Sequence, residues 1–174
     1  MLEYEKAYIA GLIDGEGCIT IIRQDQSKHS PKHKSPSYRL AVSIYNTNKN
    51  MMNWLQDKID GHRFYNRRAK SPQHKDLYSI NISAKTAEKF LVDIQPYIIA
   101  KSEQVKLALE LQNLVNTYKK YRQHNFPGEP LIQEEINKRE VIYQKMRQLN
   151  QGYKWRRKDF YQSSLRNQTV PMIL

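Results

Sequence analysis

The chain has 174 residues, of which 39% are hydrophobic, and its 29 lysines and arginines outnumber 17 acids to give a net charge of +12. The apolar share excludes a disordered chain, and the longest apolar run, residues 7–13, is far shorter than the roughly 20 residues of a membrane span. The positive charge favours nucleic acid over an anionic membrane surface, although a basic ribosome-associated protein would share this composition.

Helices and strands follow one another in an α-β-β-α-β-β-α order. In chain order we expect a helix at 3–14, strands at 18–23 and 38–45, a helix opened by 46–48, strands at 62–68 and 77–82, a short helix at 86–93, and helices at 101–123 and 131–149. Basic, polar loops at 25–37 and 69–76 separate the paired strands. Adjacent strand pairs indicate antiparallel hairpins and an α+β fold in one domain, residues 1–150, with a basic tail at 151–174.

One face of the expected sheet is apolar and the other is polar. Strand 38–45 alternates, with Leu40, Val42 and Ile44 on one side and polar residues on the other. The polar face should carry arginine, asparagine and tyrosine side chains, which suit a groove of DNA better than a second core layer. The residues that lead to this expectation are Arg39, Tyr45, Asn66 and Arg68.

The first helix carries small residues at four-residue spacing, Ala7, Gly11 and Gly15, which therefore share a face. Glycine inside a helix costs about 1 kcal/mol relative to alanine, so a close contact should compensate for it. That contact is either a second helix backbone from another copy or a tightly packed helix of the same chain.

Two acids, Asp14 and Glu16, lie at the end of this helix, where the macrodipole is negative and carbonyl groups lack partners. The carboxylates and the negative end of the helix dipole repel each other, so a cation should be bound there. Carboxylate and carbonyl oxygens together suit Mg²⁺. The alternative is two solvated acids in a turn.

The single cysteine, Cys18, excludes an internal disulfide and indicates a reducing compartment; we expect it to be a buried strand residue.

The segment Tyr8-Ile9 followed by Ala10-Gly11-Leu12-Ile13-Asp14-Gly15-Glu16-Gly17 resembles the signature of the LAGLIDADG homing endonucleases. The resemblance extends over roughly residues 4–125 and implies an αββαββα fold with a saddle-shaped antiparallel sheet and additional C-terminal helices. The signature occurs once, which in this family implies a homodimer. The implied activity is Mg²⁺-dependent (or Mn²⁺-dependent) double-strand cleavage of a long pseudo-palindromic DNA site, by an enzyme encoded in a mobile intron.

The same resemblance implies roles for individual residues. Glu16 and the Gly15 carbonyl would bind the metal, and Asp14 would cap the helix end. Lys101, which follows Gln95-Pro96-Tyr97, would stabilise charge on the scissile phosphate. Asn48 would order the attacking water, with Asn46 close to that position.

Two features depart from the family pattern or extend it. Met52 occupies an expected basic position, which puts the proton relay in doubt. The residues expected to face DNA are Thr20, Ile22, Gln24, Arg39, Ser43, Tyr45, Asn66, Arg68 and Ser79, and those expected at the dimer interface are Ala7, Ala10 and Gly11.

Two alternative functions remain open. One is an RNA maturase that assists splicing of its host intron, with intron RNA as the partner; the other is a non-catalytic DNA-binding module. The abundance of lysine, asparagine, isoleucine and tyrosine indicates an AT-rich genome, either organellar or bacterial.

Overall fold

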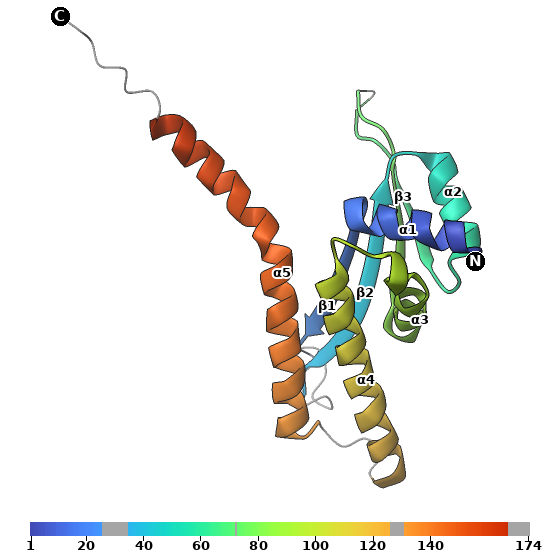
Figure 1. Cartoon of the computed structure of the whole chain (residues 1–174), viewed down its shortest axis with the longest axis vertical. Helices are drawn as coiled ribbons and strands as arrows, with labels where there is room; N and C mark the ends of the chain where they lie inside the picture. Colours follow the sequence, from blue (N-terminus) through green and yellow to red (C-terminus); the bar gives the residue numbers. More distant parts are fainter. Residues whose placement is uncertain (26–34, 72, 126–130, 167–174) are drawn as a thin grey trace, which may run out of the picture.

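The computed structural model describes residues 1–25, 35–71, 73–125 and 131–166, with side chains described as far as 119 and from 131 to 151 in the last two ranges. The elements are α1 (Glu3–Glu16), β1 (Gly17–Gln24), β2 (Ser37–Asn46), α2 (Lys49–Lys58), β3 (Arg63–Arg67), β4 (Leu77–Ser83), α3 (Ala84–Ile94), the 3₁₀ turn η2 (Gln95–Tyr97), α4 (Ser102–Asn125) and α5 (Gln133–Arg166). This order, drawn in Figure 1, confirms the predicted α+β fold of αββαββα type with further C-terminal helices.

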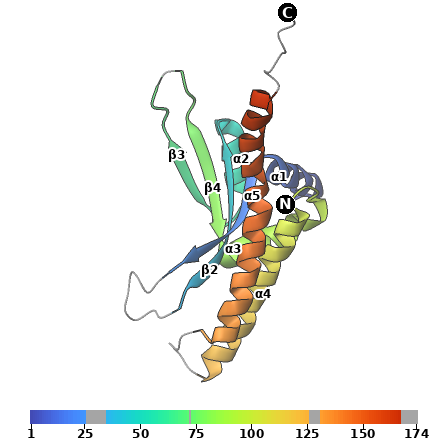
Figure 2. The same cartoon turned by 90° about the vertical axis from the view of Figure 1, so that its left-hand side faces the viewer.

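The four strands form one antiparallel sheet in the order β1-β2-β4-β3. Strand alternation places the branched aliphatic side chains on one face, where Leu40, Val42 and Ile44 are at most 1% exposed, as predicted. Figure 2 shows the helices along that side of the sheet, while the other side has no helical cover. The fold therefore has one buried sheet face and one open face.

Helix α1 is held against this core at several points. Ile9, Ala10 and Ile13 are fully buried. The Lys58 ammonium lies 2.7 Å from the Glu5 carboxylate, and its hydrogen bond holds the pKa of Glu5 below its ordinary value. Ala10 was assigned to the dimer interface, but its side chain points into the core of its own chain, because it lies on the same side of the helix as Ile9 and Ile13.

Helix α5 runs well beyond its predicted end at residue 149 and is helical to Arg166. The added segment contains no proline and one glycine, so nothing in it stops a helix. Figure 1 shows α5 passing beside β1 and extending away from the sheet. In the part of the chain that the structure describes, no helix is both long and apolar enough to cross a membrane.

Candidate functional site

The end of α1 and the start of α4 are joined by reciprocal hydrogen bonds. The Asp14 carboxylate accepts backbone N–H groups of Ile99 (2.8 Å), Ala100 (3.1 Å) and Lys101 (3.0 Å). In return, the Lys101 ammonium donates to the carbonyls of Ile13 (2.8 Å) and Asp14 (2.5 Å). Lys101 thus binds carbonyls in the last turn of α1, and Asp14 binds the N–H groups of the segment that leads into α4.

This junction explains why acids are tolerated at the end of α1. Partial burial opposes ionisation of Asp14, but the three N–H groups and the Lys101 charge outweigh it and lower the pKa of the carboxyl. The cation expected there is Lys101, 87 residues away along the chain. Asp14 is a helix cap, as the sequence implied, but it caps the approach to α4 rather than the end of its own helix.

Glu16 is exposed at the last position of α1, with Asn46 as its neighbour. The Asn46 side-chain amide donates to Glu16 Oε2, and Asn46 Oδ1 accepts the Asn48 backbone N–H at 2.8 Å. The Asn48 side chain instead accepts the Met51 N–H as the N-cap of α2. Asn46 is therefore the residue beside Glu16, whereas the family resemblance had favoured Asn48.

The oxygen donors at this point fit a hard divalent cation. A carboxylate and the neighbouring Gly15 carbonyl are the ligand types that Mg²⁺ prefers. Among the described residues there is no cluster of three or more histidine, cysteine, aspartate or glutamate side chains. Glu16 and Gly15 could thus supply part of a coordination sphere, which water and a phosphate would have to complete. Met52 is fully buried and supplies no charge here.

Strand register gathers the polar side chains on the open face of the sheet. Seven of the nine residues expected to face DNA share this face: Thr20, Ile22, Gln24, Arg39, Ser43, Tyr45 and Ser79. The Ser43 hydroxyl donates to the Asn81 side-chain oxygen (2.7 Å), and the Asn81 amide donates to Ser79 (3.2 Å). These bonds form a polar row across β2 and β4, beside a hollow of about 290 Å³ that Arg39 and Arg63 help to line.

The remaining two residues, Asn66 and Arg68, do not lie on this face. In β3, Phe64 packs on the core side, with its ring centroid 6.1 Å from that of Tyr78. Asn66 is two residues further along the strand, so it lies on the same side as Phe64. Arg68 follows the end of the strand. The residues of β3 on the open face are Arg63, Tyr65 and Arg67, opposite Asn81, Ser79 and Leu77.

The sequence contained a signal for the open-face residues of β3 and for Asn81, which were not predicted. Phe64 is the only aliphatic or phenyl side chain in this strand, so placing it inward moves Arg63, Tyr65 and Arg67 outward. Asn81 alternates with Ile80 and Ile82, which places it beside Ser79. The same alternation corrects Cys18, which is exposed on the open face opposite Ser43, not buried.

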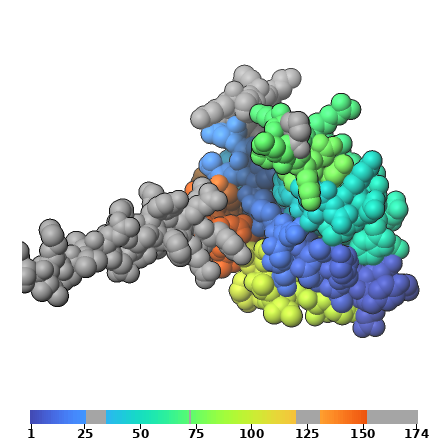
Figure 3. Space-filling model, turned by 90° about the horizontal axis from the view of Figure 1, so that it is seen from above, coloured from blue at the N-terminus to red at the C-terminus, as the bar shows by residue number. Residues whose placement is uncertain are grey.

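The small residues of α1 lie on an uncovered surface. Ala7, Gly11 and Gly15 are exposed, and a Cβ added at either glycine would meet nothing within 4 Å. Figure 3 shows α1, the dark blue segment, at the surface of this view. Packing within this chain therefore does not require glycine at these positions. The predicted basic loop includes Lys28, His29, Lys32, His33 and Lys34, which lie outside the described residues.

Solved structures share this fold at low sequence identity. The homing endonuclease I-CvuI, in complex with its target, matches with a TM-score of 0.64 and 15% identity over 84% of this chain and 82% of its own. The homing endonuclease I-TnaI matches with a TM-score of 0.59 and 15% identity over 86% and 95%. The group I intron-encoded homing endonuclease I-CeuI, complexed with DNA, matches with a TM-score of 0.62 and 15% identity over 83% and 67%.

Sequence comparison with curated proteins finds no match. The pattern of the family described as LAGLIDADG endonuclease, however, matches residues 9–99, which is more than half of the chain. The matched segment contains the motif of α1 and all four strands. This chain belongs to the LAGLIDADG endonuclease family.

Proposed function

We propose that this protein is an intron-encoded homing endonuclease that cuts both strands of a long pseudo-palindromic DNA site by Mg²⁺-dependent hydrolysis. The observation that carries the proposal is the α1–α4 junction. It brings Glu16 and Lys101 to the point where β1 begins, and β1 leads directly onto the open polar face. Phosphate chemistry and base recognition would then occur on one continuous surface.

The residues of the junction divide the chemical work. Glu16 and the Gly15 carbonyl would hold Mg²⁺, which when bound activates water and neutralises charge that develops on the phosphate. Lys101 has three N–H donors, of which two go to the carbonyls of Ile13 and Asp14. The third is available for a phosphate oxygen, and Asn46 is positioned to orient a polar group beside Glu16.

Recognition would come from the open sheet face. None of the ion pairs between described residues involves Arg39 or Arg63, so both guanidinium groups are free to meet an anionic partner. Arginine, asparagine and serine side chains can read base edges in the major groove. The solved structures of I-CvuI and I-CeuI contain DNA, which supports the same use of this fold here.

A homodimer would complete the enzyme, because one chain has one motif and two strands must be cut. Exposed glycines at Gly11 and Gly15 would let the backbones of two α1 helices approach closely. We expect Gly11→Leu to fold normally, since its side chain has room within one chain, but to remain monomeric in sedimentation. Lys106→Leu, at an exposed position of α4, is the control and should remain dimeric. A monomeric wild type, alone and on DNA, would contradict the dimer.

Glu16→Gln tests the catalytic assignment. The change keeps the size of the side chain but removes the charge needed for Mg²⁺, so cleavage should fall by at least about a hundredfold while DNA affinity is retained. Cleavage of the insertion-site DNA and binding of the same DNA should be measured in parallel. Equal cleavage by wild type and Glu16→Gln would exclude Glu16 as the metal ligand.

The buried, uncharged Met52 gives some support to the RNA maturase. A maturase would keep the basic surface without needing a complete set of catalytic cations. If neither wild type nor Glu16→Gln cleaved the candidate DNA and both promoted splicing of the host intron, the maturase would replace the nuclease as the proposed function. Sequence-specific binding with neither activity would favour the DNA-binding module.

A further inference from the structure

The outer end of the β1–β2 hairpin projects beyond the rest of the sheet. Residues 21–24 of β1 pair with residues 37–40 of β2, but β4 pairs with β2 only from Ala41 onward. This segment, here called the outer ribbon, therefore has two strands and no third. A two-stranded ribbon is marginally stable in water by itself, so its position depends on what packs against it.

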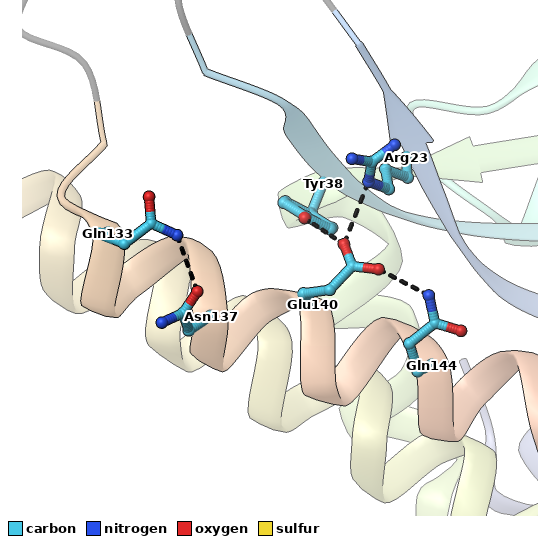
Figure 4. Close-up of polar contacts among 6 residues, drawn as sticks. All are labelled: Arg23, Tyr38, Gln133, Asn137, Glu140 and Gln144. Carbon is cyan, nitrogen blue, oxygen red and sulfur yellow. Dashed lines mark hydrogen bonds and ion pairs between the residues drawn. The ribbon is translucent and has the colours of Figure 1, made fainter.

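One carboxylate from α5 binds both strands of the outer ribbon. Glu140 Oε2 accepts the Tyr38 hydroxyl at 2.5 Å and the Arg23 Nε–H at 3.1 Å, while Oε1 accepts the Gln144 amide at 2.6 Å (Figure 4). Arg23 and Tyr38 are direct partners in the β1–β2 register. Glu140 thus joins α5 to the two strands at a single register position.

Other contacts along α5 hold the same hairpin. The Tyr143 ring packs edge-on against Tyr38, with centroids 6.1 Å apart. The Asn150 amide donates to the Ile19 carbonyl (2.9 Å), and the Leu131 N–H donates to the Ser35 hydroxyl (3.0 Å). The hairpin is therefore held at three levels, with Glu140 between the outer two.

Side-chain alternation connects this contact to the open face. Arg23 and Tyr38 point toward α5, so their neighbours Ile22, Gln24 and Arg39 point the opposite way. Any tilt of the outer ribbon would move those three side chains without breaking another strand pair.

We propose that α5, acting through Glu140, is a brace that positions the outer ribbon for DNA recognition and so sets base-pair discrimination at the outer part of each half-site. This inference rests on the proposed DNA-binding function. Arg23 lies six residues along β1 from Gly17, which is about 20 Å of strand and equals the length of about six base pairs measured from the proposed metal site. Glu140 is a positioning residue, because it contacts the ribbon and no DNA-facing group.

The test is selection of bound sequences from a randomised DNA duplex library, without Mg²⁺ so that bound DNA stays intact. Wild type, Glu140→Ala and the milder Tyr38→Phe would be compared. Glu134→Ala is the matched control, because Glu134 is also an ion-paired glutamate of α5 but its ion pair within the described part of the chain is with Lys138 of the same helix. Thermal unfolding of each variant would be recorded to verify that it is folded.

We expect Glu140→Ala to lose preference at the outer positions by at least about fivefold, with less than about a twofold change at the inner positions. Tyr38→Phe should show the same pattern more weakly, and Glu134→Ala should match wild type. Unchanged outer preference in folded Glu140→Ala and Tyr38→Phe would overturn the brace. So would a loss spread evenly over the half-site, which indicates a general structural role. A wild type without sequence preference would instead overturn the proposed function.

Discussion

The two hairpins of the sheet contribute to the same open face but are supported in different ways. The β1–β2 hairpin packs against α4 and α5, and Glu140 and Asn150 bind its strands directly. In the β3–β4 hairpin, β4 is buried between β2 and β3, but β3 is an edge strand in which four of the five residues are exposed and Phe64 provides the inward contact. The β1–β2 side of the recognition surface is thus held by helices, whereas the edge strand β3 is held mainly by its pairing with β4.

The largest expected difference comes from the glycine at the start of each hairpin. A Cβ at Gly17 would lie 2.7 Å from the Ile13 Cα, a backbone contact that no rotamer change relieves. At Gly61, φ is +63° and a Cβ would lie 3.1 Å from the Thr86 methyl group, which can shift. We expect Gly17→Ala to lower the free energy of unfolding by about 3 kcal/mol and Gly61→Ala by about 1–2 kcal/mol.

Urea denaturation of both variants would measure this difference. Equal losses in the free energy of unfolding would contradict the expected difference between the two hairpins.

Two adjacent arginines of the β3–β4 hairpin, Arg67 and Arg68, should contribute to DNA binding in different ways. Arg67 lies on the open face, whereas Arg68 follows the end of β3. Arg67→Ala should cost about 1–3 kcal/mol of binding and relax preference at one position of the half-site. Arg68→Ala should weaken all sequences alike, as loss of a phosphate contact does. Binding to the target and to single-base variants distinguishes the two outcomes, and the reverse pattern would restore the original assignment of Arg68.

The smallest expected effect is the pH dependence of the contact between Glu140 and the β1–β2 hairpin. Partial burial opposes ionisation of Glu140, but hydrogen bonds from Tyr38 and Gln144 and the Arg23 charge outweigh it and lower its pKa. The stabilisation is therefore present above the unfolded-state pKa of about 4.3 and is lost as pH falls through the lower folded-state pKa.

For this half-exposed group we expect about 1 kcal/mol or less. Unfolding of wild type and Glu140→Gln across this pH range provides the measurement. Their difference in stability should shrink on the acid side; a constant difference would mean that the carboxylate charge contributes nothing to docking of α5.

How far the sequence predicted these features depended on the range of the interactions. The strand face of Leu40, Val42 and Ile44 follows from local alternation, and it was predicted correctly. In the predicted strand 62–68, Asn66 and Arg68 were placed on the open face for their polarity instead of by the position of Phe64, and the assignment was wrong. The family resemblance favoured Asn48 over Asn46, but the Asn48 side chain caps α2.

Contacts between distant segments could not be predicted in this way. The bond from Arg23 to Glu140 joins residues 117 positions apart, and no local pattern in either segment specifies the other. The family resemblance marked Asp14 and Lys101 as important, but not that each side chain would bind the main chain beside the other.

The reciprocal bonds between Asp14 and Lys101 have a mechanical consequence. They close the chain from 14 to 101 into a loop that contains all four strands. Tension applied between α1 and α4 would pass through this junction and leave the strands unloaded until the bonds ruptured. If bound DNA is bent during cutting, the strain that reaches these helices would bypass the sheet, and the contacts to the bases would stay in register.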